Sequence, residues 1–302
     1  MKRYAAIDIG TNAVRLLIKS VSEENGNMRF QKELLVRVPL RLGFDVFVGG
    51  RISEAKAGRL KHLMKSYSQM MKVYAVDRYR ACATSAMRDA VNGAEIIRMI
   101  RKKCGIDIDI IDGSEEARMV YDTHIEQFGS RRGSLLYVDV GGGSTEVNLL
   151  TDGELRFSQS FNIGTVRMLA GSVADGEWDS LRKTLAEQTA GLNGVDIVGS
   201  GGNINKIYKL VSNKDKRYKR LTVNAVRALH EKIAPMTMEE RMAHFDLKPD
   251  RADVIAPAMD IFLAVAEVAA AEHIYVPQIG LSDGIIDGLY MADRAAAEQT
   301  EE

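Results

Sequence analysis

The strongest constraint on the fold is an internal repeat, because the chain builds the same run of local elements twice. The apolar residues 4–7 end in Asp8, which is followed by the loop Gly10-Thr11-Asn12 and a second apolar run. The apolar residues 135–138 end in Asp139, which is followed by the loop Gly141-Gly142-Gly143-Ser144 and again by an apolar run. A repeat of this kind indicates two related units within one chain.

Each copy then reaches a pair of residues that is typical of a hairpin turn. The pair is Asn25-Gly26 in the first copy and Asp152-Gly153 in the second, and such pairs favour the type I′ turn between antiparallel strands. Each half is therefore predicted to open with a strand, an Asp-x-Gly loop, a strand, a tight turn and a strand. The strands after the loops are expected at residues 13–18, 28–36, 145–150 and 155–161.

Helical and strand periodicities describe most of the remaining chain. Ser53 can cap a helix in which apolar residues from Leu60 to Tyr74 recur at helical spacing. Ile106, Ile108 and Ile110 alternate with polar residues, which predicts a strand. A further strand is expected at 79–84, and further helices at 94–103, from 114 onward, and at 176–192, 203–211, 224–233 and 250–271.

Strands that alternate with helices predict an α/β protein with a covered sheet. The chain has 302 residues, which is enough for two domains. We expect a first domain at residues 1–123 and a second at 124–302, with the connection near 129–133. The residues leave open whether the last helix packs back on the first domain.

Composition excludes several classes of protein. Basic and acidic residues number 41 each, so the net charge is zero, which argues against a general nucleic-acid binder or a membrane-surface protein. Cys82 and Cys104 form no CxxC pair, so no zinc or disulfide framework is expected. The apolar run 254–271 contains Asp260 and Glu267, which a membrane span tolerates poorly. Without an apolar leader at the N-terminus, we expect a cytoplasmic protein.

The two repeated loops are candidate phosphate sites. Glycine lets backbone N–H groups approach an anion, and an acid at a strand end, here Asp8 or Asp139, can hold a divalent cation. A single loop of this kind is more often a plain hairpin loop, but two matching loops favour the phosphate interpretation. A third run, Gly199-Ser200-Gly201-Gly202, precedes a predicted helix and is either an anion site or a plain turn.

Two neighbouring acids lie at the start of another predicted helix. Glu115 and Glu116 follow Ser114, so both fall in the first turn, where acids complement the helix dipole. A carboxylate facing the phosphate site could instead act as a general base for an attacking water. The residues alone leave both interpretations open.

Several basic residues are further candidates for binding phosphate. Arg88, just beyond a predicted strand end, either pairs with phosphate oxygens or forms an ordinary surface ion pair. Arg15 and Arg118 are weaker candidates for the same role. The run 214–220 is the densest basic segment, and it is either a solvated loop or a binding site for a polyanion.

These motifs, in this order, resemble those of the exopolyphosphatase and guanosine pentaphosphate phosphatase (Ppx/GppA) family of the actin-like superfamily. The likeness extends to about Gly288, and its specific part is the succession of SAMRDA, GSEEAR and DVGGGSTE. It implies an α/β fold of two ribonuclease-H-like (actin-like) domains with a cleft between them and mixed sheets flanked by helices. The matching stretches are 6–18, 41–47, 83–90, 111–121 and 138–147, with looser matches at 197–204 and 250–262.

The resemblance also implies roles for single residues. Glu116, the second glutamate of GSEEAR, would be the catalytic base, and Arg88 would stabilise charge on the transferring group. Asp8, Asp139 and Glu146 would bind Mg²⁺ or another divalent cation. Phosphates would be held by Gly10, Thr11, Asn12, Gly142, Gly143, Ser144, Gly201 and Gly202.

The implied activity is the release of the terminal phosphate of inorganic polyphosphate by water attack. Guanosine pentaphosphate is the alternative substrate, and a homodimer is expected only at the level of the family. Two rival functions are a sugar or acetate-type kinase of the same superfamily and a non-catalytic polyphosphate or alarmone sensor. The GSEEAR stretch argues against the kinase, and the complete set of acids argues against the sensor.

The chain departs from the family pattern at two places. Asn203 stands where a threonine is common, and Ser282-Asp283 stands where an arginine and an acid are often found. Longer relatives also carry an additional C-terminal helical domain. The resemblance therefore does not specify how the distal phosphates or a nucleoside are held, or whether long chains are degraded processively.

Overall fold

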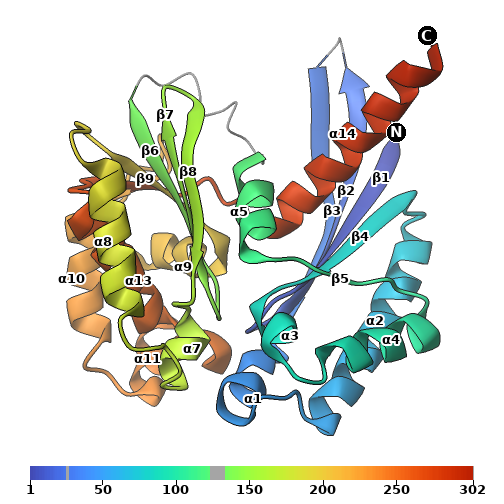
Figure 1. Cartoon of the computed structure of the whole chain (residues 1–302), viewed down its shortest axis with the longest axis horizontal. Helices are drawn as coiled ribbons and strands as arrows, with labels where there is room; N and C mark the ends of the chain where they lie inside the picture. Colours follow the sequence, from blue (N-terminus) through green and yellow to red (C-terminus); the bar gives the residue numbers. More distant parts are fainter. Residues whose placement is uncertain (25–26, 123–132, 302) are drawn as a thin grey trace. The chain divides into compact units, whose positions relative to one another are not determined.

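The protein divides into two compact units in the computed structural model, which describes residues 1–24, 27–122 and 133–301. Unit 1 comprises Met1–Asp112 and Leu281–Glu302, and unit 2 comprises Gly113–Gly280 (Figure 1). Unit 2 begins at Gly113, before the sequence-predicted boundary at 124, because helix α5 (Gly113–Asp122) packs on strands of that unit. The predicted turn at 25–26 and most of the predicted connection at 129–133 lie outside the described residues.

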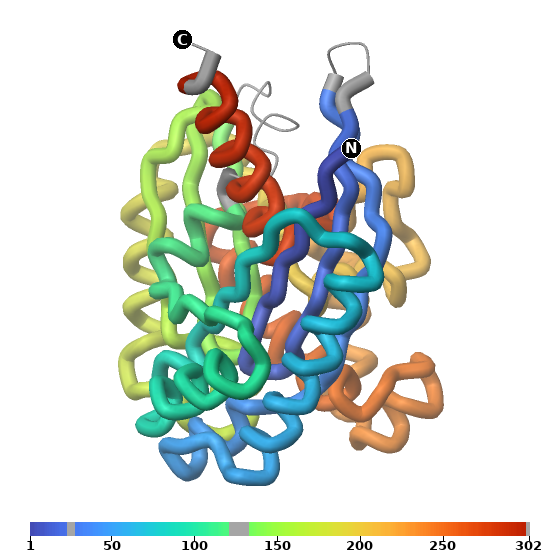
Figure 2. Tube along the Cα trace, turned by 90° about the vertical axis from the view of Figure 1, so that its right-hand side faces the viewer, coloured from blue at the N-terminus to red at the C-terminus, as the bar shows by residue number. Residues whose placement is uncertain are grey.

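Unit 1 is built on a five-stranded sheet of order β3-β2-β1-β4-β5. The first three strands form an antiparallel meander, and β4 and β5 run parallel to β1. Figure 2 shows the meander in blue, followed by the helices that cover it. The strands are β1 (Lys2–Ile9), β2 (Val14–Glu24), β3 (Asn27–Val38), β4 (Arg78–Ala83) and β5 (Asp109–Ile110). The helices are α1 (Leu42–Gly49), α2 (Glu54–Val73), α3 (Ser85–Asp89), α4 (Gly93–Cys104) and α14 (Leu281–Glu301).

The predicted capping of α2 is confirmed, and one predicted strand is shortened. The Ser53 side chain accepts a hydrogen bond from the Lys56 amide, and the apolar side of α2 is buried in the core. The strand expected from Ile106 is limited to Asp109–Ile110, where the chain pairs with β4. Ile106 and Ile108 are nevertheless buried. Their alternation with polar residues therefore arises from packing in the core and not from strand pairing.

Helix α14 packs on the sheet face that carries Tyr4. The Tyr4 hydroxyl donates to Asp293 over 2.9 Å. Near the start of the helix, Lys19 Nζ lies 2.7 Å from Asp283 Oδ1, and these side chains are only 9% and 17% exposed. Asp283 thus neutralises a buried lysine of β2.

Replacing Asp283 with Asn is expected to lower the stability of the protein by about 2 kcal/mol. The change would leave the Lys19 ammonium buried without its counter-charge, which costs more than losing an exposed pair. Urea denaturation measures the effect, with Asp107→Asn as the control. Asp107 pairs with Arg101, and both side chains are more than 60% exposed. Equal shifts for the two variants would contradict this role.

Unit 2 repeats the frame of unit 1 in a six-stranded sheet of order β10-β11-β9-β6-β7-β8. Strands β6, β7 and β8 form the meander, and β9 and β11 continue the sheet in parallel with β6. The two glycine loops fold alike: the Gly10 amide donates to the Ala13 carbonyl over 3.1 Å, and the Gly141 amide donates to the Ser144 carbonyl over 3.0 Å. The strands are β6 (Ser134–Val140), β7 (Thr145–Thr151), β8 (Glu154–Phe161), β9 (Asp196–Ser200), β10 (Arg220–Thr222) and β11 (His273–Tyr275).

The second hairpin turn forms as predicted. Asp152 and Gly153 have φ of 51° and 84°, and positive φ at both central residues is the requirement of a type I′ turn. Five strands of each sheet share one order and one pattern of directions, and β10 adds an antiparallel edge strand to the sheet of unit 2. These features confirm the predicted class, an α/β protein with two mixed sheets flanked by helices.

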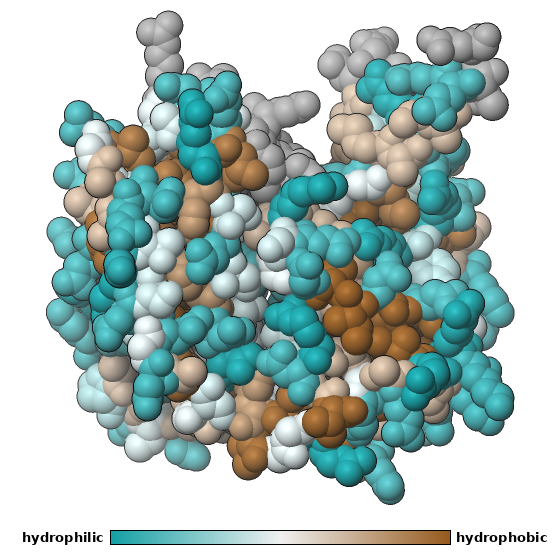
Figure 3. All heavy atoms as spheres, viewed as in Figure 1, coloured by the Kyte–Doolittle hydropathy of each residue, from teal (hydrophilic) through white to brown (hydrophobic). Residues whose placement is uncertain are grey.

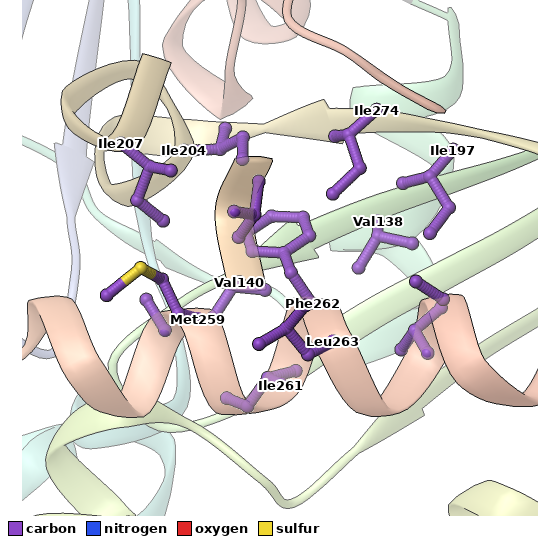
Figure 4. Packing of buried hydrophobic residues seen from close by; sticks show 14 of the residues in the cluster. Val138, Val140, Ile197, Ile204, Ile207, Met259, Ile261, Phe262, Leu263 and Ile274 are labelled. Atoms are coloured by element: carbon purple, nitrogen blue, oxygen red, sulfur yellow. The ribbon is translucent and has the colours of Figure 1, made fainter. Parts of the chain in front are cut away.

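The core of unit 2 lies between its sheet and α13. Figure 4 shows Phe262 and Met259 of α13 facing Val138 and Val140 of β6, with Ile204 of α9 beside them. The helix predicted at 250–271 is divided into α12 and α13. The described helices are α5, α7 (Thr165–Leu169), α8 (Glu177–Thr189), α9 (Gly201–Leu210), α10 (Val223–Ile233), α11 (Met238–Phe245), α12 (Pro249–Ala252) and α13 (Ile255–Val268).

Helix α8 covers part of this core with its inner side and faces solvent with its outer side. Leu181 and Leu185 are buried, whereas Arg182 and Lys183 are exposed, in keeping with the mainly hydrophilic surface at the left of Figure 3. Among the residues that the structure describes, no helix is both long and apolar enough to cross a membrane.

Candidate functional site

A row of four polar residues crosses one face of the sheet of unit 2. In the strand register, Ser200, Asp139, Glu146 and Ser160 are successive partners on β9, β6, β7 and β8. Residues that are direct partners place their side chains on the same face. Ser200 Oγ donates to Asp139 Oδ2 over 3.2 Å, and Ser160 Oγ donates to Glu146 Oε1 over 2.8 Å. The two serines thus orient the two carboxylates.

Helix α5 lies over the same face and carries Glu116. A Cβ on Gly113 would lie 2.3 Å from the Cβ of Ser160, so the helix begins in direct contact with the row. Asn148, two residues along β7 from Glu146, donates from Nδ2 to the Ala117 carbonyl over 3.0 Å. Glu116 is 9% exposed. The helix therefore holds this carboxylate on the side of the sheet that presents Asp139 and Glu146.

Replacing Asn148 with Ala is expected to lower stability by about 2 kcal/mol, because the buried Ala117 carbonyl loses its donor. Urea denaturation measures the effect. The exposed Asn162 is the control, and Asn162→Ala should leave the stability unchanged. Equal stability of the two variants would contradict the role of this bond in anchoring α5.

The glycine loop of unit 2 turns its carbonyls toward α7. The Gly142 carbonyl accepts from the Val166 and Arg167 amides over 2.8 and 3.0 Å, and Arg167 Nε donates to the Gly143 carbonyl over 2.7 Å. Within the described part of the chain, the Gly142 and Gly143 amides donate to no protein acceptor. Amides left in this way around a turn are suited to bind an anion.

Gly164 supports this loop and was missed in the sequence. A Cβ at residue 164 would lie 2.4 Å from the Gly143 carbonyl carbon and 2.5 Å from that of Gly142. Only glycine allows the chain entering α7 to approach the loop this closely. No local pattern could have revealed it, because the contact joins residues more than twenty positions apart.

The third glycine loop packs against the acid of β6. Gly201 has φ of +89°, and a Cβ there would lie 2.5 Å from Asp139 Oδ1. The next residue, Gly202, lies against the guanidinium of Arg251, which also donates to Asn203 Oδ1 over 2.8 Å. Asn203 donates in turn to the Val140 carbonyl over 3.4 Å. The Asn203 side chain therefore joins β6 to α12.

In unit 1, Asp8 is paired with the basic residue opposite it. Arg15 is its cross-strand partner, and Arg15 Nη1 donates to Asp8 Oδ2 over 2.5 Å. The Asp8 side chain is 4% exposed. Burial, with the charge of Asp8 as the second cause, raises the pKa of Tyr67 above its usual value. Arg15 thus compensates Asp8, which the sequence interpretation assigned to metal binding.

The loop of unit 1 is also joined to the helix that carries Arg88. Thr11 Oγ1 lies 2.8 Å from Ser85 Oγ in the first turn of α3. Arg88 Nη1 donates to the Ile111 carbonyl over 2.8 Å, and the Arg88 side chain is 27% exposed. Thr11, Arg88 and the backbone of Gly10 and Asn12 therefore belong to one end of this sheet. Arg118 lies in unit 2, exposed on α5.

The acids of unit 2 fit a magnesium ion by their chemistry. Among the described residues, no group of three or more His, Cys, Asp or Glu could hold a metal. Magnesium requires fewer protein ligands, because it is usually held by one or two carboxylates together with substrate phosphates and water. Asp139 and Glu146, adjacent in register and oriented by serines, supply such a pair.

Comparison with known proteins places these features in a family. The model of the Ppx/GppA phosphatase family matches residues 21–292. The "Guanosine-5'-triphosphate,3'-diphosphate pyrophosphatase" of Aeromonas hydrophila is 25% identical over 95% of this chain, which spans 59% of that relative. "Exopolyphosphatase 2" of Mycobacterium tuberculosis is 27% identical over 94% of this chain and 98% of its own length.

Solved structures of two other proteins also resemble the chain. The crystal structure of the Aquifex aeolicus member of the Ppx/GppA family aligns with a TM-score of 0.76 at 26% identity, covering 97% of this chain and 98% of its own. An exopolyphosphatase from Cytophaga hutchinsonii, 23% identical, has the same fold with a TM-score of 0.80 over 95% and 98% of the two chains. Since the family model spans most of its length, the chain belongs to the Ppx/GppA phosphatase family.

Proposed function

We propose that the chain is a phosphoanhydride hydrolase that releases the terminal phosphate of inorganic polyphosphate. The observation that carries the proposal is the placement of α5, which holds Glu116 on the sheet face that presents Asp139 and Glu146. Guanosine pentaphosphate is the second candidate substrate, because one group of relatives is named for acting on it. The exopolyphosphatase of nearly equal length favours polyphosphate.

In the proposed reaction, Glu116 takes a proton from a water molecule as that water attacks the terminal phosphorus atom. A bond forms between the water oxygen and phosphorus, the bridging phosphorus–oxygen bond breaks, and the shortened chain leaves with the electron pair. The amides of Gly142 and Gly143, with Ser144, bind phosphate oxygens where negative charge is concentrated. Asp139 and Glu146 would hold magnesium, which when bound neutralises charge on the phosphates.

Residues of unit 1 and of the third glycine loop are also proposed to bind phosphate. Arg88 and Thr11, with the backbone of Gly10 and Asn12, bind phosphate oxygens through charge-assisted hydrogen bonds. The N-terminus of α9 at Gly201 and Gly202 offers further donors. In unit 1, Asp8, which is paired with Arg15, would bind a divalent cation directly or through water.

A phosphate-release assay tests the function. The purified protein is incubated with Mg²⁺ and, separately, with short-chain and long-chain polyphosphate, guanosine pentaphosphate and ATP. We expect release from polyphosphate that stops when EDTA removes the metal, and the ratio to guanosine pentaphosphate identifies the preferred substrate. Binding of polyphosphate without any release would instead indicate a sensor.

A further inference from the structure

A cationic turn in unit 2 has no role in the proposed hydrolysis step. Residues 214–220, here called the basic turn, contain the cations Lys214, Lys216, Arg217, Lys219 and Arg220 with Asp215 as their one acid. The whole chain has a net charge of zero, so this concentration is local. Clustered like charges repel one another, which makes an ordered cluster of this kind informative.

The basic turn is ordered around its acid. The Asp215 carboxylate accepts from the amides of Arg217 and Tyr218 over 3.0 and 3.1 Å, and from Arg220 Nε over 3.0 Å. These bonds, the Tyr218 amide first, lower the pKa of Asp215. The backbones of Asp215 and Arg220 also exchange two hydrogen bonds of 3.1 Å. The Asp215 carboxylate is therefore bound by the backbone of the turn and by Arg220.

The other cations face outward. Lys216, Arg217 and Lys219 are exposed, and within the described residues none of them forms an ion pair with a carboxylate. Tyr218 is 48% exposed, and the guanidinium carbons of Arg217 and Arg220 lie 5.2 and 5.4 Å from its ring centroid. These distances are within the range of cation–π attraction, which holds Arg217 against the ring. The turn therefore presents three positive charges that have no carboxylate partner, on an ordered backbone.

The strand register places the basic turn at the same end of the strands as the row of four polar residues from Ser200 to Ser160. Arg220 enters β10 opposite Tyr275, the last residue of β11, and Tyr275 pairs with Val198 near the end of β9. The Lys219 carbonyl accepts from the Val276 amide over 2.7 Å. Three strand spacings separate β10 from β6, about 14 Å across the sheet. An extended polyanion held near Asp139 could span this distance, whereas a single phosphate could not.

We propose that the basic turn is a distal subsite for long-chain inorganic polyphosphate. This inference rests on the proposed function only in taking polyphosphate as the substrate. The turn binds phosphates far from the cleaved end, so it contributes to the affinity for long chains and contributes nothing to the affinity for tripolyphosphate, which is too short to reach it. It explains how the distal phosphates are held in a chain that departs from its family at Asn203 and Ser282.

The test removes the three outward charges and compares substrates of different length. The turn variant carries Lys216→Gln, Arg217→Gln and Lys219→Gln. Its KM for long-chain polyphosphate should rise roughly tenfold, since three exposed ionic contacts each contribute modestly, while kcat and all parameters for tripolyphosphate stay unchanged. The KM of the wild type should also depend more steeply on salt concentration than that of the variant.

A control variant loses the same charge elsewhere, at the exposed Lys72, Lys102 and Lys103 of α2 and α4. Its KM for long chains should match that of the wild type. An unchanged KM in the turn variant, or an equal rise for tripolyphosphate, would overturn the subsite. Loss of RNA binding with unchanged polyphosphate binding would overturn it in favour of a nucleic-acid site.

Direct binding separates this inference from the proposed function. Long-chain polyphosphate is titrated into wild type and turn variant by calorimetry, in EDTA so that no hydrolysis occurs. If the wild type binds the chain tightly and the turn variant binds it about tenfold more weakly, the subsite stands even where the phosphate-release assay detects no hydrolysis. Equal binding by both proteins overturns the subsite and leaves a measured hydrolase activity intact.

Discussion

Replacing Glu116 with Gln is expected to lower kcat for polyphosphate by about a thousandfold, because a positioned general base contributes roughly 10² to 10⁴ in rate. Gln has nearly the same shape, but its amide cannot take the proton from the attacking water. The hydrogen bond from Asn148 to the backbone of α5 remains, so the helix keeps its place. Steady-state phosphate release measures kcat, and calorimetry measures polyphosphate binding, which should be nearly unchanged.

The neighbouring Glu115 is the matched control. It lies in the same first turn of α5 but is less buried than Glu116, so Glu115→Gln alters the helix dipole equally without removing the base. It should retain most of the wild-type kcat. A full wild-type rate in Glu116→Gln would refute the assignment of the base. Similar losses in both variants would show that the acids act only through the stability of the helix.

Replacing Gly164 with Ala is expected to destabilise the protein by about 3 kcal/mol or more and to abolish most of its activity. The backbone there has φ of −144° and ψ of 158°, which alanine adopts readily, so the cost is purely steric. The new methyl group would lie 2.4 to 2.5 Å from backbone atoms of Gly142 and Gly143, and backbone cannot move aside as a flexible side chain does. The glycine loop of unit 2 would therefore be displaced.

Gly58 provides the comparison for that substitution. It lies within α2, and a Cβ there would meet no atom within 4 Å. Gly58→Ala should stabilise the protein by about 0.5 to 1 kcal/mol, because alanine favours the helix. Urea denaturation and phosphate release are measured for both variants. A stable and active Gly164→Ala protein would contradict the role given to this close approach.

The repeated frame of the fold was predictable because its signals are local. An apolar run, an Asp-x-Gly loop and a hairpin pair each depend on neighbouring residues, and the turn at Asp152 and Gly153 formed as expected. The strand expected from Ile106 was mostly wrong, since burial in a core produces the same alternation as pairing in a sheet. Periodicity reports which side chains are buried and leaves hydrogen bonding unspecified.

The candidate site was predictable in part. Asp139 and the glycine loops stand out in the sequence, but Gly164, Gly113 and Asn148 do not, because each matters through contact with a distant segment. Glu116 shows the limit most clearly. At the start of a helix its charge has a sufficient local explanation, and only the packing of α5 on β7 and β8 places it over the acids of the sheet.

Isotope labelling tests most directly the central claim that water attacks the terminal phosphorus atom. The wild-type protein is incubated with Mg²⁺ and polyphosphate in ¹⁸O-labelled water, and the products are analysed by mass spectrometry. Water attack at the terminal phosphorus atom would place one labelled oxygen in each released phosphate and none in the shortened chain. Label at the new end of the chain, or transfer of unlabelled phosphate to an acceptor, would contradict it.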